Sequence, residues 1–175
     1  VADLVHPKWL LMLVRPGLAR DDVPLVLEFV GMLLSTSPSL AQTWTRLGGF
    51  RVLERTLPPH WDVPCVLPWM WTLLLGPHAP KSSLYHTFAH ATAVAHPQAL
   101  RVIVQCMAHG MMACRTAPAK RRASLPHIPA PPPGLTALED SVRLLVVHSH
   151  NEDVRALLML APTLVAVLRA TAPCF

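Results

Sequence analysis

DVPLVL at residues 22–27 returns as DVPCVL at residues 62–67, forty positions later and with one change in six. The pair Leu33–Leu34 returns at the same interval as Leu73–Leu74, so the register is kept across the whole segment. A period of about forty residues, carried by apolar helices, is typical of stacked helical repeats of the armadillo or HEAT kind. We therefore expect an all-α fold, an armadillo/HEAT-like α-solenoid segment whose units bury their apolar faces against neighbours.

The first copy of this echo predicts a helix that is apolar on nearly all sides. One stripe at helical spacing consists of Val23, Val26, Leu27, Val30, Leu33 and Leu34, and a second consists of Leu25, Phe29 and Met32. Only Glu28 and Gly31 interrupt these stripes. The pattern predicts a helix that is sandwiched between other helices.

The aspartates that open the two copies predict helix caps. Asp21 or Asp22 would accept hydrogen bonds from free N–H groups at the start of the first helix, with Pro24 in its first turn. Asp62 would do the same for the second helix. Pro68 falls inside the second copy, where a missing N–H is expected to kink the helix.

Other helices are expected between proline and glycine breaks. In chain order they cover about 8–15, 37–47, 50–57, 82–95, 98–115, 135–148, 151–159 and 162–170. Residues 117–134 differ, because they hold six prolines and several basic side chains, and they predict a disordered or polyproline-like loop. The expected organisation is helical repeats at 1–116, a basic proline-rich loop at 117–134 and a further helical repeat at 135–175.

The composition predicts apolar surfaces that other segments of protein cover. Hydrophobic residues make up 52% of the sequence and charged residues only 14%. We expect this chain to be a fragment of a much larger one, whose neighbouring repeats would cover the apolar ends. No secretory signal is expected, because Asp3, Lys8 and Trp9 stand where a basic region and an apolar core would follow one another. No membrane span is expected either, because the most apolar segments carry Pro68, Arg101 or His109.

Cysteines and tryptophans lie within apolar runs and predict packing roles. The four cysteines are Cys65, Cys106, Cys114 and Cys174, and the five tryptophans are Trp9, Trp44, Trp61, Trp69 and Trp71. The cysteine spacing lacks the density of a disulfide framework, which favours buried thiols in a reducing compartment. The tryptophans have no interleaved basic residues, so we expect them in the core rather than stacked on bases.

Positive charge dominates the middle of the chain. No acidic residue occurs between Asp62 and Glu139. The basic residues in that interval are Lys81, Arg101, Arg115, Lys120, Arg121 and Arg122. Half of them fall in the proline-rich loop, which argues against a folded basic groove, and we expect no nucleic-acid binding.

The loop contains one candidate modification site. The basic patch Lys120, Arg121 and Arg122 lies just before Ser124, in a pattern that basic-directed kinases read. Phosphorylation of Ser124 would lower the local charge by about two units and would release the patch from an acidic partner. The alternative is a loop that only makes the chain more soluble.

Histidines and carboxylates are the residues that could bind a metal or take part in catalysis. His86 and His90 lie one helical turn apart, and His148 and His150 lie near Asp153, but neither group has a third ligand nearby in the sequence. The paired carboxylates are Asp21–Asp22, Glu139–Asp140 and Glu152–Asp153, each expected at a helix start. No nucleophile with an adjacent base is recognisable. We expect neither catalysis, nor metal, nor cofactor.

Several segments resemble the helical-repeat region of the large BEACH proteins. They are PKWLLML at 7–13, PLVLEFVGMLL at 24–34, SPSL at 37–40, GFRVL at 49–53, HWDVP at 60–64 and HSHNEDVRAL at 148–157. Within that family the chain is most similar to the members with WD repeats and a FYVE finger, the Alfy-like type. The resemblance covers most of residues 6–76 and, more loosely, 135–170, and residues 117–134 depart from it.

The resemblance implies a non-enzymatic scaffold segment that binds other proteins within a large cytoplasmic protein of vesicle traffic or selective autophagy. Its partners would be other proteins and the remainder of the parent chain. A different class of function is peripheral attachment to an anionic membrane surface, such as an endomembrane, through the basic loop and the Met-rich helix at 98–122. The lipid-binding and WD-repeat modules of the family would lie outside these residues.

Overall fold

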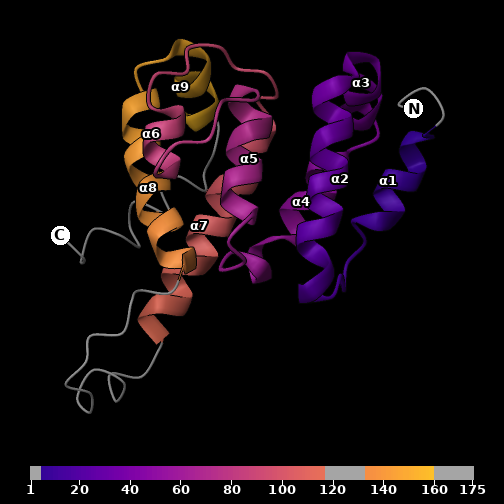
Figure 1. Ribbon diagram of the computed structural model, residues 1–175, viewed down its shortest axis with the longest axis horizontal. Helices are drawn as coiled ribbons and strands as arrows, with labels where there is room; N and C mark the ends of the chain where they lie inside the picture. Colours follow the sequence, from indigo (N-terminus) through magenta and orange to yellow (C-terminus); the bar gives the residue numbers. More distant parts are fainter. Residues whose placement is uncertain (1–4, 117–132, 160–175) are drawn as a thin grey trace.

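The chain is all-helical in the computed structural model, which describes residues 5–116 and 133–159 (Figure 1). The helices are α1 (Pro7–Leu13), α2 (Val23–Thr36), α3 (Pro38–Arg46), α4 (Gly49–Thr56), α5 (Val66–Leu75), α6 (Leu84–Phe88), α7 (Ala99–Thr116), α8 (Pro133–His148) and α9 (Glu152–Met159). Two short 3-10 turns, η2 (Arg20–Asp22) and η3 (Pro58–His60), lead into α2 and away from α4. No strand occurs in these two described ranges.

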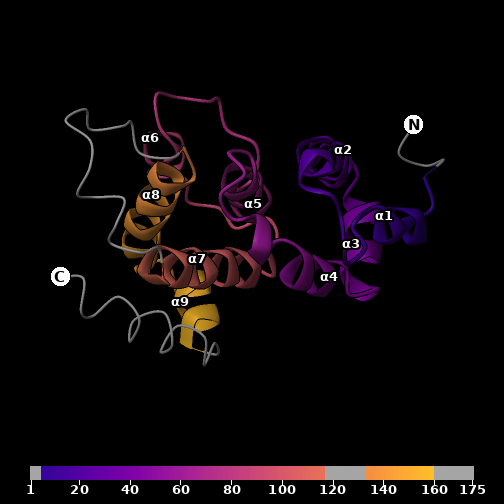
Figure 2. The ribbon, with the colours of Figure 1, turned by 90° about the horizontal axis from the view of Figure 1, so that it is seen from below.

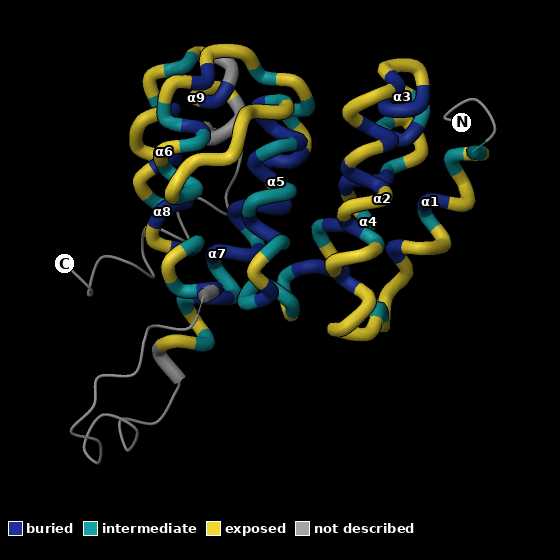
Figure 3. The backbone as a smooth tube through the Cα atoms, viewed as in Figure 1, coloured by how far each residue is buried: buried dark blue, intermediate teal, exposed yellow. Residues whose placement is uncertain are grey.

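The helices form two layers, which are clearest in Figure 2. Helices α2, α5 and α8 follow one another in one layer, with α2 packed on α5 and α5 on α8. Helices α3, α4 and α7 form the other layer, with α3 packed on α4 and α4 on α7. Helix α5 also packs on α7 and thereby joins the layers. Figure 3 shows the result, since α5 is mostly buried whereas α1 is mostly exposed.

The two copies of the echo lie side by side as α2 and α5. Five pairs of matching apolar positions are buried in both copies, namely Val23 with Val63, Leu27 with Leu67, Val30 with Met70, Leu33 with Leu73 and Leu34 with Leu74. Each such side chain contributes about 1.5–3 kcal/mol to folding when it leaves water. The apolar spacing of the sequence thus correctly indicates which side of each helix faces inward.

The starts of the two helices differ from the predicted caps. Asp22 precedes α2 but accepts no hydrogen bond through its side chain. Asp62 lies four residues before α5, and its carboxylate pairs instead with Arg20 at 2.6 Å. Because α5 begins only at Val66, Pro68 lies in the first turn, where N–H groups have no helical partner. The predicted kink at Pro68 is therefore wrong.

The second apolar stripe of α2 is not covered. Leu25 is 72% exposed, Met32 51% and Phe29 38%. Helix α2 is sandwiched between α3 and α5, as predicted, but within the described residues this second stripe is not covered. This helix therefore presents an open apolar face.

Two predicted segments have different bounds. The helix expected at 82–95 covers only Leu84–Phe88, and the chain then extends until the Ala95 N–H donates to the Leu74 carbonyl at 2.7 Å. Helix α8 begins at Pro133, so the end of the expected loop belongs to a helix. The other residues of that loop and the helix expected at 162–170 lie outside the described residues.

The Glu139–Asp140 pair lies in the middle of α8, not at a helix start as predicted. Asp140 is buried, and its Oδ2 accepts a hydrogen bond from the Tyr85 N–H at 3.2 Å. The carboxylate therefore holds the first turn of α6 against α8. Glu152 does begin α9, as expected.

Tryptophan rings fill the contacts between helices. Trp44 and Trp71 are fully buried. The Trp69 ring of α5 lies so close to Gly31 of α2 that a Cβ there would stand 2.5 Å from it. Trp9, by contrast, is 72% exposed, which contradicts its predicted place in the core. Glycine at position 31 is what permits α2 and α5 to approach across an indole ring.

The three described cysteines differ in environment. Cys106 is fully buried, and burial raises the pKa of its thiol to about 12. Cys65 is half-buried, whereas Cys114 is exposed, contrary to the prediction of a buried thiol. Cys174 lies outside the described residues.

No single helix in the described ranges is both long and apolar enough to cross a membrane. The segments Arg20–Thr36 and Pro38–Arg46 meet those criteria only when taken together, across a bend of 115°. Their apolar side chains that face the core include Leu27, Val30 and Trp44, all nearly or fully buried by protein.

Candidate functional site

The candidate site residues that the sequence singled out belong to a part of the chain that the structure does not describe. The basic patch Lys120, Arg121 and Arg122 and the candidate phosphorylation site Ser124 lie outside the described residues. Among 5–116 and 133–159, no three histidine, cysteine, aspartate or glutamate side chains converge as a metal site would require. What the structure offers instead is a set of open hollows between successive helices.

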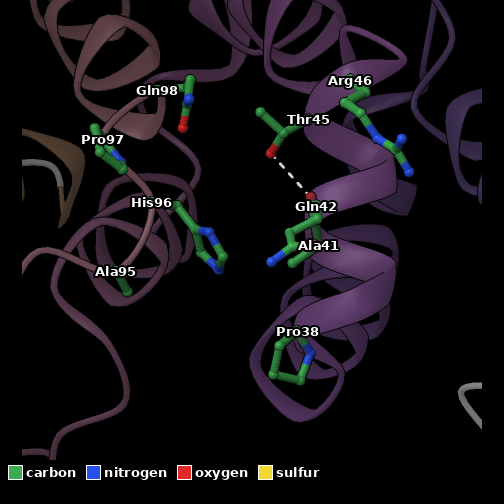
Figure 4. Close-up of a pocket in the computed structure, with 9 residues that line it drawn as sticks. All are labelled: Pro38, Ala41, Gln42, Thr45, Arg46, Ala95, His96, Pro97 and Gln98. Atoms are coloured by element: carbon green, nitrogen blue, oxygen red, sulfur yellow. Dashed lines mark hydrogen bonds between the residues drawn. The ribbon is translucent and has the colours of Figure 1, made fainter.

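One hollow of about 640 Å³ separates α3 from the segment that leads into α7. Figure 4 shows His96 on one side of it, facing Ala41 and Gln42 of α3 on the other. Thr45 Oγ1 is held by the Ala41 carbonyl at 2.9 Å, while Arg46 points away and donates to Thr43 Oγ1. Uncharged polar groups therefore line this end of the surface.

His96 lines the hollow and also packs against the core. Its ring lies 5.9 Å from the ring of Phe50, a buried residue of α4. Burial lowers the pKa of His96, and the backbone of Leu34 offsets part of that effect. The imidazole is therefore neutral near pH 7, and it offers a hydrogen bond rather than a charge.

Farther along the same layer the hollows become basic. A hollow of about 230 Å³ is shared by Thr45, Gly48 and Phe50 on one side and by Gln98 and Arg101 on the other. It continues into one of about 430 Å³, lined by Arg51, Glu54, Arg55, Arg101 and Gln105. We call this continuous depression between α4 and α7 the arginine furrow.

The guanidinium groups of the furrow are not neutralised within the described residues. Two ion pairs occur among the described residues, Arg20 with Asp62 and Arg143 with Asp140. In that part of the chain the furrow arginines, Arg51, Arg55 and Arg101, therefore have no carboxylate within ion-pair distance. The expectation that no folded basic groove exists is therefore wrong. That expectation rested on the basic residues between Asp62 and Glu139, whereas Arg51 and Arg55 of α4 lie outside that interval.

A second, apolar groove of about 750 Å³ lies between α2 and α5. Its lining includes Met32, Pro64, Cys65, Pro68, Trp69 and Pro77, with Glu28 as its carboxylate. Partial burial raises the pKa of the Cys65 thiol, so the thiol stays protonated near neutral pH. The open face of α2 thus continues into a hollow suited to apolar side chains.

These surfaces offer two kinds of binding contact. The arginine furrow offers charge-assisted hydrogen bonds to carboxylate or phosphate groups. The apolar groove offers area that becomes favourable when water leaves it. The sequence does carry one sign of the furrow, since Arg51 and Arg55 stand four residues apart on a short helix, but the contribution of Arg101 depends on the packing of α4 against α7.

No family model, curated protein or solved structure matches this chain.

Proposed function

We propose that this chain is a helical-repeat segment of the armadillo/HEAT kind that acts as a non-enzymatic scaffold for binding other proteins. The observation that carries this proposal is the packing of α2, α5 and α8 in one layer and of α3, α4 and α7 in the other. In such an arrangement each unit contacts its neighbours and leaves long grooves between successive helices. Both grooves described above open between helices of neighbouring units.

The sequence echo supports the same proposal. Helices α2 and α5 carry its two copies, forty residues apart, and they are direct neighbours in the first layer. Five matched apolar positions face the interior in both. An exposed apolar stripe on α2 adds surface that a partner or a further repeat would cover.

The narrower part of the proposal rests on the resemblance to BEACH proteins. It places the segment in a large cytoplasmic protein of vesicle traffic or selective autophagy, with other proteins and the rest of its parent chain as partners. The alternative, attachment to anionic endomembranes through the basic loop and α7, has less support. Helix α7 buries Ile103, Val104 and Met107, which are at most 2% exposed, and exposes Met112, which is 55% exposed.

Proximity labelling in cells tests the scaffold function. The full chain would be fused to a biotin ligase and compared with two variants of exposed residues, Met32→Lys with Thr36→Lys in the apolar groove and Arg51→Glu with Arg101→Glu in the furrow. We expect each pair to remove a distinct set of labelled proteins, whereas the exposed control Arg155→Glu removes none. The same labelled proteins in every variant would contradict the proposal.

A further inference from the structure

The arginine furrow gathers positive charge from two helices that are distant in the sequence. Arg51 and Arg55 lie one helical turn apart on α4, and Arg101 reaches the same hollow from α7. Glu54 is the one carboxylate among the described residues that line it. Three cations therefore share the furrow with a single anion.

The furrow widens on one side into a neighbouring hollow. Arg51 and Arg55 also line this second depression, of about 530 Å³, together with Arg46 and Leu47. Leu47 is 41% exposed and is the large apolar side chain at this edge. A ligand that reaches across α4 would meet arginines first and then an aliphatic side chain.

Like charges that share a hollow repel one another, and an incoming anion relieves that repulsion. Arginine suits this role because its planar fork donates two parallel hydrogen bonds to a carboxylate. The furrow also contains the amides of Gln98 and Gln105, which are able to bond the backbone of an extended chain. Charge and hydrogen-bonding groups are thus both complementary to an acidic peptide.

We propose that the arginine furrow binds an extended acidic segment of a partner protein, with an aliphatic residue of that segment on Leu47. This inference rests on the proposed function as a protein-binding scaffold and names the chemistry of one partner. It assigns Arg51, Arg55 and Arg101 to recognition of carboxylates. It assigns Glu54 to a repulsive contact that weakens binding.

Two other anionic ligands fit the furrow less well. A bilayer is broad and flat, whereas the arginines lie around a recessed hollow between two helices. Single-stranded nucleic acid binds where aromatic side chains stack on its bases. Phe50, the aromatic residue of the lining, is only 5% exposed and so cannot serve as such a platform.

Fluorescence anisotropy with the full chain tests this inference. The probe is a labelled peptide of about eight residues, glutamates around one leucine, which spans about 26 Å when extended. The matched probe replaces every glutamate with glutamine. We expect binding of the glutamate peptide alone, weakened by added salt because the interacting charges are solvent-exposed.

Two variants of exposed or half-buried furrow residues have opposite expected signs, and a third variant outside the furrow is the control. Arg51→Glu with Arg101→Glu should weaken binding by about tenfold or more, since it replaces attraction with repulsion. Glu54→Gln should tighten binding by about twofold or more, because it removes the like charge. Arg155→Glu, which reverses one charge on the exposed surface of α9 where the double variant reverses two, should leave affinity within about twofold. Circular dichroism of each variant verifies that the helices are retained.

Several results would overturn the inference. Equal binding of the two peptides, or no effect of Arg51→Glu with Arg101→Glu in a folded variant, would exclude recognition of carboxylates. A single-stranded oligouridine or phosphatidylserine vesicles that bind through the same arginines, while the glutamate peptide does not, would replace the peptide with that ligand. If the peptide fails but Met32→Lys with Thr36→Lys still changes the labelled proteins in cells, the scaffold function stands and only this inference falls.

Discussion

Helices α2 and α5 begin from nearly the same six residues and use them differently. In α2 the helix starts directly after Asp22, whereas in α5 three further residues separate Asp62 from the first helical residue. Position 31 in the first copy is glycine, and the equivalent position 71 is a fully buried tryptophan. Leu27 and Leu67 nevertheless occupy matching buried sites.

The two copies therefore share their inward-facing apolar positions, whereas the other positions adapt each copy to its neighbours. Gly31 accepts the Trp69 ring from α5. Trp71 points toward α8, where its Nε1–H donates to Ser141 Oγ at 2.9 Å. Each copy is thus shaped to fit the next helix along the layer.

Removing the ring of Trp71 should have the largest effect. Trp71→Ala leaves a cavity in the contact between α5 and α8, and it should lower the free energy of unfolding by about 3–5 kcal/mol. Urea denaturation followed by circular dichroism measures this change. Trp9→Ala is the matched control, since Trp9 is 72% exposed and should matter little. Equal losses from the two variants would show that the second copy does not depend on its buried ring.

Adding a methyl group at Gly31 should have the next largest effect. A Cβ there would overlap the Trp69 ring, so Gly31→Ala should cost about 1–3 kcal/mol of stability. In a Trp69→Ala background the overlap is gone, and the same change should become neutral or stabilising by up to about 1 kcal/mol, because alanine favours helix more than glycine does. A double-mutant cycle in urea measures the reversal. The same cost in both backgrounds would rule out the ring contact as its cause.

Acid should destabilise the region around Trp71. His148 is buried, its ring lies 5.9 Å from the Trp71 ring, and its Nε2 lies 3.0 Å from the Phe88 carbonyl. Burial lowers the pKa of His148, so the unfolded chain takes up a proton at a higher pH than the folded chain does. Stability should therefore fall as the pH drops below about 6.5, the usual histidine value, toward the lowered pKa.

The variant His148→Gln separates this effect from other titrations. Glutamine retains an N–H donor for the Phe88 carbonyl but does not titrate, so the slope of melting temperature against pH should become shallower between about pH 6.5 and 5. A remaining slope is expected from His96, whose pKa burial also lowers. An unchanged slope would mean that His148 takes up its proton equally in both states.

Breaking the Arg20–Asp62 pair should have the smallest effect. Arg20 lies just before the first copy and Asp62 opens the second, but the two side chains are 53% and 37% exposed. The hydrogen bond from Arg20 lowers the pKa of Asp62, so the contribution is present above the usual aspartate pKa and is lost as the pH falls through the lowered one. Asp62→Asn should therefore lower the melting temperature only slightly, less in high salt. A salt-independent loss would indicate a structural role for Asp62 instead.

The sequence was most informative about what is buried. Apolar spacing located α2, α5 and α7 and predicted most of the inward positions of α2 and α5, because burial depends on a periodicity that is local. It could not predict that Leu25 and Phe29 stay exposed, since an apolar stripe looks the same whether or not a neighbour covers it. The ring that rests on Gly31 also depends on tertiary packing.

The candidate site was harder to predict for the same reason. Arg51 and Arg101 meet only because α4 packs on α7, fifty residues along the chain. Asp62 looked like a cap because aspartate before proline commonly begins a helix, but a guanidinium forty-two residues earlier competes for its carboxylate. Long-range partners override local preference at both places.

The layered packing has a consequence for how the chain reaches its fold. Helices contact partners two or three elements away, since α2 packs on α5 and α4 packs on α7. Such moderate sequence separations cost less loop-closure entropy than contacts between distant parts of the chain would. Folding can then begin at α5, which already touches α2, α6, α7 and α8, and spread outward in both directions. Helix α1, bordered chiefly by α3, would be the last to form and the first to open, so its amides should exchange with solvent fastest.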